Sequence, residues 1–426
     1  MQKSKLHILD ALGIAFPAYK LKTTRRIVKA LARLGAKPES TALVHGFKTS
    51  ANIAAIVNGT PFGAMDFDDL HEQARLHPTA VILPAVLSVC EANGDSGRDL
   101  ITAYMSGAEV MCRLGSASTE RFHQRGIQAT SACGSVASAL AVGKLLGLSR
   151  RQLISAMGIA TNLAIGSSLS VRISSYLSNV DPGRAAETGL IAAFLASGNV
   201  SLGMEDVLEG PFGFFRTYTS GGDDVRRRLV EGIGDIWEMN RTFIKRYPLG
   251  YDFTRYIDAV LALRAEHHFV PSDVAEVIYG DNSTAVNRFS EPARLKKRPA
   301  TWLEASTSRY FVLATAISEG KITRDSFSPS KMADPSIHRL MDRTRYVLDE
   351  CSHWVEVVLK SGEKHRMTQG ELIPTSPERV VRKFYDNASA VIGTEKAKSI
   401  RSLVERLEGV NDVGVICRQM TFGKPA

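Results

Sequence analysis

Residues 58–78 read Asn58-Gly-Thr-Pro-Phe-Gly-Ala-Met-Asp66-Phe-Asp68-Asp69-Leu-His71-Glu-Gln-Ala-Arg-Leu-His77-Pro78, between two apolar segments with helical spacing. Four carboxylates and two imidazoles fall within twelve residues, which is too dense for an ordinary surface turn. Gly59, Pro61 and Gly63 predict that a helix starting at 51 ends near 58, and Pro78 is typical of the first turn of the next helix. We therefore expect a loop held between two buried helices, where catalytic groups commonly collect.

The length and composition indicate an ordinary globular protein of two domains. The chain has 426 residues, of which 44% are hydrophobic and 23% charged, and this length exceeds what one core usually supports. The formal net charge is +9, but Lys and Arg are spread along the chain and no nucleic-acid-binding module is recognisable. We expect no nucleic-acid partner and favour a small acidic substrate.

The cysteines and the apolar stretches predict a cytoplasmic protein with no membrane partner. The five cysteines are widely spaced, without a CxxC pair, and no secretory segment precedes them. The most apolar stretch, residues 80–90, is interrupted by Pro84 and is too short to span a bilayer.

Helical spacing of apolar residues dominates both ends of the chain. Helices are expected over 4–37 in two parts, 51–58, 79–91, 98–115, 128–147, 150–165, 183–198, 377–391 and 395–407. The helix over 128–147 has hardly any large side chain before its last turn, which is typical of a central helix with close neighbours. The polar segment 167–182 is a second candidate site loop.

The middle of the chain differs, because strand-like alternation first appears at 274–280. A hairpin that turns at Ser361-Gly362 is expected over 354–368. We therefore predict a mainly α protein. Its two parts are a large all-helical domain from residues 1–243 and 376–426 and a smaller α+β lid domain from residues 244–375.

The central loop resembles the signature of the MmgE/PrpD family, which includes 2-methylcitrate dehydratase, cis-aconitate decarboxylase and iminodisuccinate epimerase. The matching residues are Asn58-Gly59, Met65 to Asp69, and His77-Pro78. Further similarities follow in the family's order at Leu145-Leu-Gly-Leu148, Gly183-Arg-Ala-Ala-Glu-Thr-Gly189, Leu208-Glu-Gly-Pro-Phe-Gly-Phe214, Lys245-Arg-Tyr-Pro248, residues 355–362 and Ser376-Pro-Glu-Arg379. The resemblance covers nearly the whole chain.

The resemblance implies a fold and a class of reaction. It implies a helical domain from both chain ends, an α+β lid, a homodimer, and an active site in the cleft between the domains. It also implies no metal and no organic cofactor. Family members mostly move a proton next to a carboxylate of a small polycarboxylic acid, so a small carboxylate is the expected substrate.

The resemblance also implies site residues, but several family positions are changed. Asp66 and His77 match the family's catalytic-site aspartate and histidine. The other family positions hold Gly63 and Gln128 instead of histidines, Ser178 instead of lysine, Thr254 instead of histidine, and Phe311, beside Tyr310, instead of tyrosine. The candidate catalytic residues are Asp66, His77 and Gln128, and the candidate substrate-binding residues are Asp69, Ser178, Arg184, Lys245, Thr254 and Tyr310.

These changes predict altered chemistry. A dehydratase needs a base beside the carboxylate and an acid for the leaving hydroxyl, and histidine suits both roles because it titrates near neutral pH. Gln128 can form hydrogen bonds but cannot exchange a proton at neutral pH. His77, oriented by Asp66, remains as one acid/base unit. We therefore expect a cofactor-independent lyase or isomerase whose reaction is not the ancestral methylcitrate or aconitate reaction.

Other interpretations stay open at this point. Asp66 and Asp69 could only cap the following turn, His71 is expected to be a solvated loop residue, and His123 could replace the missing second imidazole. Arg184 and Lys245 could form ordinary ion pairs. At the level of function, the alternatives are a specialised biosynthetic enzyme that cyclises or dehydrates a larger intermediate, and a non-catalytic binding protein.

Overall fold

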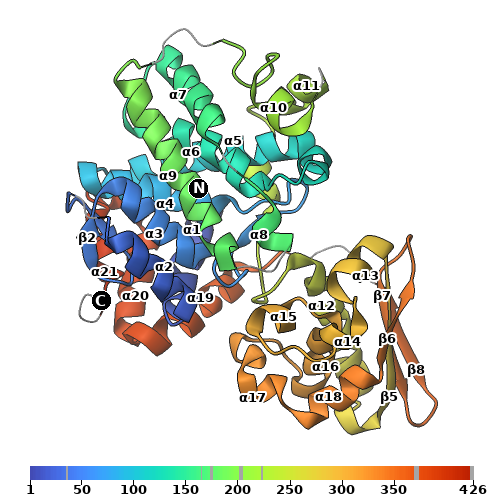
Figure 1. Cartoon of the computed structure of the whole chain (residues 1–426). Helices are drawn as coiled ribbons and strands as arrows, with labels where there is room; N and C mark the ends of the chain where they lie inside the picture. Colours follow the sequence, from blue (N-terminus) through green and yellow to red (C-terminus); the bar gives the residue numbers. More distant parts are fainter. Residues whose placement is uncertain are drawn as a thin grey trace. The chain divides into compact units, whose positions relative to one another are not determined.

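The computed structural model describes residues 1–34, 37–164, 166–172, 176–200, 205–221, 224–368 and 374–422. The chain forms two compact units (Figure 1): unit 1 comprises Met1–Ile244 and Thr375–Ala426, and unit 2 comprises Lys245–Pro374. The predicted mainly α fold is confirmed. Within the described ranges, no helix has both the length and the apolar character needed to cross a membrane.

Unit 1 is built from helices of both chain ends. They are α1 (Gln2–Ala18), α2 (Lys22–Ala32), α3 (Ala51–Gly63), α4 (Pro78–Asn93), α5 (Gly97–Gln124), α6 (Ala129–Leu145), α7 (Arg150–Leu163), α8 (Leu169–Arg172), α9 (Asp181–Ser197), α10 (Phe214–Thr219), α11 (Asp224–Val230), α19 (Pro377–Ile392), α20 (Thr394–Glu405) and α21 (Gly414–Gln419). Short 3₁₀ turns are η1 (Tyr176–Asn179), η2 (Glu238–Arg241) and η6 (Leu407–Gly409). Helices α19 and α20, near the red end of the colour scale, lie beside the blue α1 (Figure 1).

Helix α6 is the centre of unit 1, as its composition predicts. From residue 129 to 143 only Leu140 is not buried, and α6 packs against α4, α5, α7 and α9. Small side chains permit this, because they let neighbouring helices approach closely. Its neighbour α7 begins at Ser149, whose hydroxyl accepts the Gln152 N–H in a capping box.

The predicted end of the third helix near residue 58 is wrong, because α3 continues to Gly63. Pro61 cannot donate a backbone hydrogen bond, yet it lies inside the helix. The Thr60 hydroxyl donates to the Ile56 carbonyl, 2.9 Å away. Gly59 is not a stop either. It lies against Gly183 of α9, where a Cβ would overlap the Gly183 backbone.

Two short antiparallel sheets accompany the helices of unit 1. Strand β1 (Ser40–Ala42) pairs with β2 (Phe47–Thr49), and β3 (Asp69–His71) pairs with β4 (Thr242–Ile244). The second sheet holds part of the central loop, which was expected to be irregular. Beside it, the Thr375 hydroxyl donates to the Ile244 carbonyl at 2.6 Å and joins the points where the chain leaves and re-enters unit 1.

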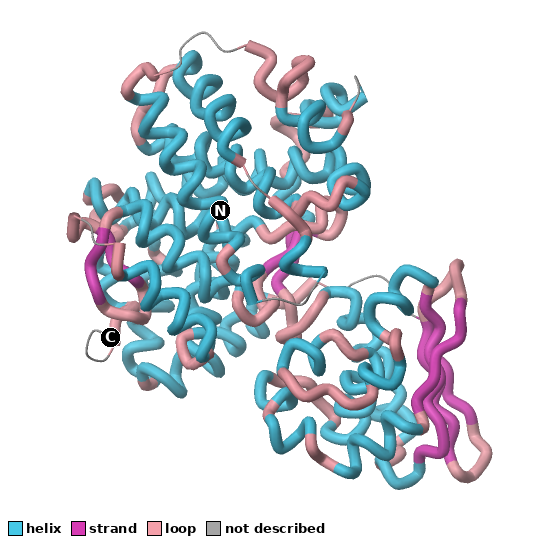
Figure 2. Tube along the Cα trace, in the orientation of Figure 1, coloured by secondary structure: helices cyan, strands magenta, loops and turns pink. Residues whose placement is uncertain are grey.

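Unit 2 is an α+β unit with a four-stranded sheet in the order β6-β5-β7-β8. The strands are β5 (Val274–Asp281), β6 (Thr344–Leu348), β7 (Trp354–Leu359) and β8 (Lys364–Thr368), and only the β5–β6 pair is parallel. The helices of unit 2 lie on one side of this sheet (Figure 2). They are α12 (Thr254–His267), α13 (Ser283–Phe289), α14 (Ala293–Lys296), α15 (Trp302–Ser306), α16 (Arg309–Glu319), α17 (Pro329–Met332) and α18 (Pro335–Asp342). The predicted hairpin is confirmed, with Gly362 in its turn at φ 94°.

We expect Gly59→Ala to destabilise unit 1 by about 1–3 kcal/mol, because the new methyl group forces α3 and α9 apart. Gly409→Ala is the matched control, since a Cβ at Gly409 meets no atom within 4 Å. Urea unfolding of the two variants checks this. Equal urea midpoints for the two variants would contradict this prediction, because they would show that α3 and α9 can move apart without loss of stability.

We expect His45 to make unit 1 less stable in acid. It is buried against Tyr19, its Nε2 has no hydrogen-bond partner among the described residues, and burial lowers the pKa of His45 from 6.5 to about 4. The unfolded chain therefore binds more protons between these values, so stability falls as pH drops from 6.5 towards 4. In urea unfolding from pH 4 to 7.5, His45→Gln should lose less stability over this range than the wild type. His123→Gln, which changes an exposed histidine, should follow the wild type.

Candidate active site

The central loop reverses direction between α3 and α4 by way of strand β3. Asp66 has φ 49°, in the left-handed region that Asp tolerates better than most residues. The chain then enters β3, and a further bridge pairs His71 with Leu76. His77 is the N-cap residue of α4, with Pro78 at the first helical position.

Asp66, Asp68 and His77 form the only group of metal-ligating side chains found among the described residues. One ligand atom from each lies within 4.8 Å of the other two. His77 Nδ1 is 2.9 Å from Asp68 Oδ2, and the side chains are 26% and 4% exposed, respectively. A partly exposed imidazole therefore stands against a buried carboxylate. Two carboxylate oxygens and one imidazole nitrogen could also hold a divalent cation.

His77 forms an ion pair with Asp68, and the expectation that Asp66 orients the ring stays a prediction. Asp66 belongs to the same cluster within 4.8 Å. The family resemblance singled out Asp66 among three neighbouring aspartates, but the pattern did not indicate that Asp68 lies next to His77.

The backbone of His77 is attached to the start of α6. The His77 N–H donates to the Thr130 hydroxyl at 3.3 Å. Gln128 is the N-cap residue of α6, its side-chain oxygen accepts the Ser131 hydroxyl, and its own N–H donates to the Gly166 carbonyl at 2.6 Å. The N-termini of α4 and α6 are thus linked through Thr130, and both present positive helix-dipole ends.

Asp69 lies in a buried network behind the cluster. Its Oδ2 is 2.7 Å from His7 Nδ1 and accepts the Thr79 hydroxyl at 2.5 Å, while its Oδ1 accepts the Thr79 N–H at 3.2 Å. The Thr79 oxygen is 2.5 Å from the hydroxyl of Tyr104, whose pKa burial raises well above its usual value. Asp69 is 3% exposed. Its carboxylate therefore anchors the first turn of α4, two residues beyond His77.

The expectation that His71 is a solvated loop residue is wrong. His71 is fully buried, and both ring nitrogens have partners. Nδ1 accepts the Ala74 N–H at 3.1 Å, and Nε2 contacts Glu238 at 3.1 Å. The proton of a neutral ring then lies on Nε2, facing Glu238. Burial lowers the pKa of His71 and Glu238 opposes this shift. Glu238 lies 167 residues away, so no local pattern indicates this contact.

The remaining candidates of unit 1 lie around the start of α9. A Cβ at Gly63, the position of a family histidine, would lie 3.0 Å from Pro182 Cγ. Ser178 is half-buried in η1. Arg184 is exposed and forms an ion pair with Glu187 on its own helix. His123, the suggested replacement imidazole, is exposed in the last turn of α5.

Lys245, Thr254 and Tyr310 belong to unit 2 and are all buried. Thr254 begins α12. Tyr310 lies in α16, edge-on to Tyr279 and 4.7 Å from the Lys297 ammonium, and burial raises the pKa of Tyr310 to about 12. A phenol with this pKa is a hydrogen-bond donor at neutral pH.

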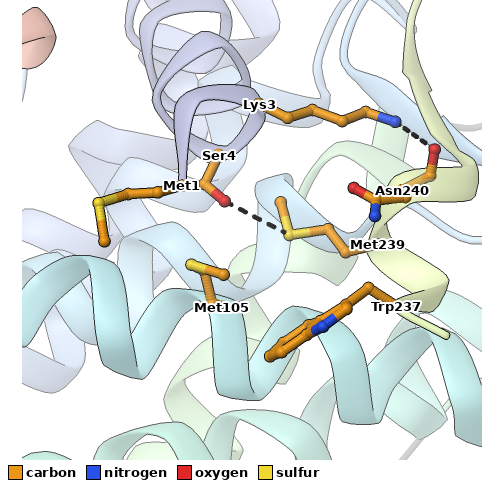
Figure 3. A pocket seen from close by; sticks show the side chains of 7 residues that line it. All are labelled: Met1, Lys3, Ser4, Met105, Trp237, Met239 and Asn240. Carbon is orange, nitrogen blue, oxygen red and sulfur yellow. Dashed lines mark hydrogen bonds between the residues drawn. The ribbon is translucent and has the colours of Figure 1, made fainter. Parts of the chain in front are cut away.

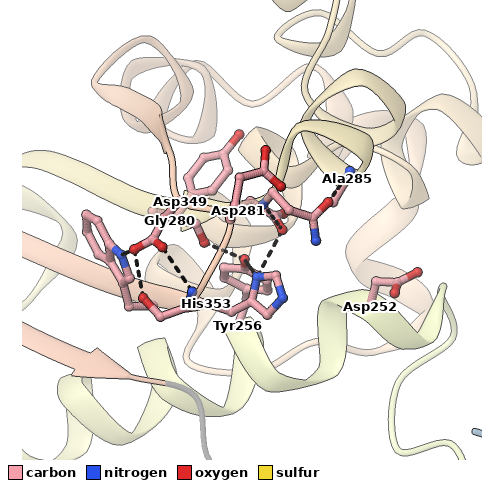
Figure 4. Close-up of polar contacts among 12 residues, drawn as sticks. Asp252, Tyr256, Gly280, Asp281, Ala285, Asp349 and His353 are labelled. Atoms are coloured by element: carbon pink, nitrogen blue, oxygen red, sulfur yellow. Dashed lines mark hydrogen bonds and ion pairs between the residues drawn. The ribbon is translucent and has the colours of Figure 1, made fainter.

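Unit 2 also contains a polar cluster that sequence reasoning missed (Figure 4). Arg309, 1% exposed, donates to Asp281 at 2.5 Å and lies over the Tyr256 ring. The other oxygen of Asp281 is 3.1 Å from His353 Nδ1, and the Tyr256 hydroxyl donates to the Gly280 carbonyl at 2.6 Å. An arginine directly before Tyr310 was the available signal, but its partners Asp281 and Tyr256 come from β5 and α12.

Unit 1 has a surface pocket of about 130 Å³ that contains none of the candidate residues (Figure 3). It is lined by Met1, Lys3, Ser4, Met105, Trp237, Met239 and Asn240. The Lys3 ammonium bonds the Asn240 carbonyl and the Ser4 hydroxyl approaches the Met239 sulfur at 3.9 Å. Three of its lining residues, Met1, Met105 and Met239, are methionines, so the lining is rich in thioethers.

Comparisons with known proteins match two family domains along the chain. The MmgE/PrpD N-terminal domain matches residues 1–226 and the MmgE/PrpD C-terminal domain matches residues 247–409. The chain belongs to the MmgE/PrpD family.

The curated relatives include several cis-aconitate decarboxylases. The enzyme of Homo sapiens is 28% identical over 450 residues, covering 98% of this chain and 89% of the relative. The enzyme of Mus musculus is 27% identical over 453 residues, covering 98% and 88%. The cis-aconitate decarboxylase-like protein oryM of Aspergillus oryzae is 25% identical over 446 residues, covering 97% and 91%. These similarities support a lyase-type family.

We expect the neutral His77 ring to carry its proton on Nδ1. If Nδ1 were unprotonated, its lone pair would face the negatively charged Asp68 oxygen 2.9 Å away, and the two would repel each other. Nitrogen-15 NMR of labelled histidine distinguishes the two tautomers. Asp68→Asn should shift the population towards the Nε2–H form more strongly than Asp66→Asn. If Asp66→Asn has the larger effect, Asp66 is the orienting residue after all.

Proposed function

We propose that this protein is a cofactor-independent lyase or isomerase that removes and returns a proton next to a carboxylate of a small molecule. The observation that carries the proposal is the pair of a partly exposed His77 and a buried Asp68, 2.9 Å apart. We propose that the nearby Asp68 carboxylate keeps the ring proton on Nδ1, which leaves Nε2 as the basic nitrogen, the arrangement of a general base. The membership of the MmgE/PrpD family supports the same class of reaction.

The roles follow from the surroundings of each residue. We propose that His77 carries the proton, that Asp68 fixes the ring, and that Asp66 adjusts the charge of the cluster. Asp66 and Asp68 would repel a substrate carboxylate. The linked N-termini of α4 and α6 attract one, and Gln128 stands at the second of them with an amide that can orient the substrate. Asp69, buried behind the cluster, supports α4 instead of touching substrate.

We also propose that the reaction is not cis-aconitate decarboxylation itself. Gly63 and Gln128 stand at two positions where the family resemblance implies histidines, and Pro182 fills the space beside Gly63. Arg184 is paired with Glu187 and adds no uncompensated positive charge for a tricarboxylate. This last contact favours the second candidate function, a specialised biosynthetic step on a larger and less acidic intermediate.

Proton exchange in heavy water tests the proposal. The purified protein is incubated with cis-aconitate and with hydroxy- and amino-substituted dicarboxylates and larger monocarboxylates, and loss of carbon-bound protons is followed by proton NMR. We expect exchange with at least one substrate other than cis-aconitate, unchanged by EDTA. His77→Ala should lower the rate by about 10²–10⁴-fold, the usual contribution of a general base.

His123→Ala is the matched control, since it removes an exposed histidine of the same unit and should retain the wild-type rate. Full activity of His77→Ala would overturn the assignment. Loss of activity only in His123→Ala would give the role to that residue. Thermal stabilisation by a carboxylate without any exchange or carbon dioxide release would support the non-catalytic alternative.

A further inference from the structure

Lys383 of α19 reaches the site loop from the far end of the chain. Its ammonium is 2.8 Å from Asp10 Oδ1 and 3.0 Å from Asp10 Oδ2, and it donates to the Phe67 carbonyl at 2.7 Å. It also lies over the Phe67 ring, 3.6 Å from the centroid. The Lys383 side chain is 8% exposed and that of Asp10 2%. One buried cation thus joins α1, α19 and the loop.

The Phe67 carbonyl belongs to the peptide group that links Phe67 to Asp68. Fixing this peptide plane fixes the direction in which the chain leaves Phe67 and enters Asp68, the two residues on either side of the bond. Asp68 Oδ2 must reach His77 Nδ1 at 2.9 Å, and a peptide rotation would move it away. The hydrogen bond from Lys383 is therefore placed where it controls the distance between the carboxylates and the imidazole.

The ion pair persists at neutral pH. Burial raises the pKa of Asp10 to about 6, Lys383 opposes this shift, and the other groups facing Asp10 are Asp69 and His7. At pH 7 to 8 the carboxylate is ionised and holds the ammonium in position over the Phe67 carbonyl.

We propose that Lys383 is a positioning residue for the acid/base pair: by binding the Phe67 carbonyl, with Asp10 as its counter-ion, it keeps Asp68 directed at His77. The inference rests on the proposed function only in taking His77 as the proton carrier. Its contact with the Phe67 carbonyl acts on the backbone directly before Asp68.

Lys383→Met and Lys5→Met are a matched pair for the test. Lys5 is also a buried lysine of unit 1, 2.6 Å from the Glu408 carboxylate and donating to the Glu405 carbonyl at 2.7 Å, but its partners are C-terminal elements rather than the site loop. Both variants lose a buried ion pair and both should be less stable. The decisive readouts are the nitrogen-15 tautomer signature of His77 and, with a substrate that exchanges, kcat and KM measured separately.

In Lys383→Met we expect the His77 ring to shift towards the Nε2–H tautomer, kcat to fall by about 10–100-fold and KM to change little, because a small misplacement of a catalytic group is costly. Lys5→Met should keep the wild-type spectrum and kcat, and Lys383→Arg should restore part of both. An unchanged His77 spectrum in Lys383→Met, or an equal change in Lys5→Met, would overturn the proposal.

Two further outcomes remain decisive. If Lys383→Met does not fold, Asp10→Asn tests the same contact, since it removes the counter-ion and should move the His77 spectrum in the same direction; an unchanged spectrum would again refute the positioning role. If no substrate exchanges, the spectrum alone decides the question. A normal spectrum in an active Lys383 variant refutes positioning and leaves the proposed function intact.

Discussion

The buried ion pair between Asp10 and Lys383 is the constraint on which the helical unit and its site loop both depend. It joins helices from opposite ends of the chain and continues to the Phe67 carbonyl. Two charges removed from water are held there only because each compensates the other, and loss of one partner of such a pair typically costs about 3–5 kcal/mol. The same ammonium that forms this ion pair also binds the peptide group between Phe67 and Asp68.

The three aspartates of the loop differ because their surroundings differ. Asp69 is buried. Its carboxylate oxygens bind His7 and Thr79, and the contacts with Thr79 attach Asp69 to the first turn of α4. Asp68 faces the imidazole of His77. Asp66, in its left-handed turn, is the most exposed of the three. The three neighbouring aspartates thus differ in their burial and in the groups that they contact.

Local signals in the sequence predicted local structure well. The cap at Ser149, the hairpin glycine Gly362 and the small residues of α6 each determine their element through neighbours a few residues away. The features that the sequence did not predict share a different cause. Helix α3 packs against Gly183, and His71 contacts Glu238. Around the pair of Asp68 and His77, the backbone binds Lys383 and Thr130. Contacts across more than fifty residues decide these features, and a single sequence does not display them.

The discontinuity of unit 1 has a consequence for biosynthesis. Asp10 and Lys383 are separated by 373 positions, so the first helix leaves the ribosome long before its partner has been translated. Unit 2 is contiguous, from Lys245 to Pro374, and all its strands are available before α19 is made. Closing so long a loop is slow, and an unpaired buried carboxylate cannot be accommodated in the meantime. The packing of α1 against α19 can therefore form only after α19 has been translated.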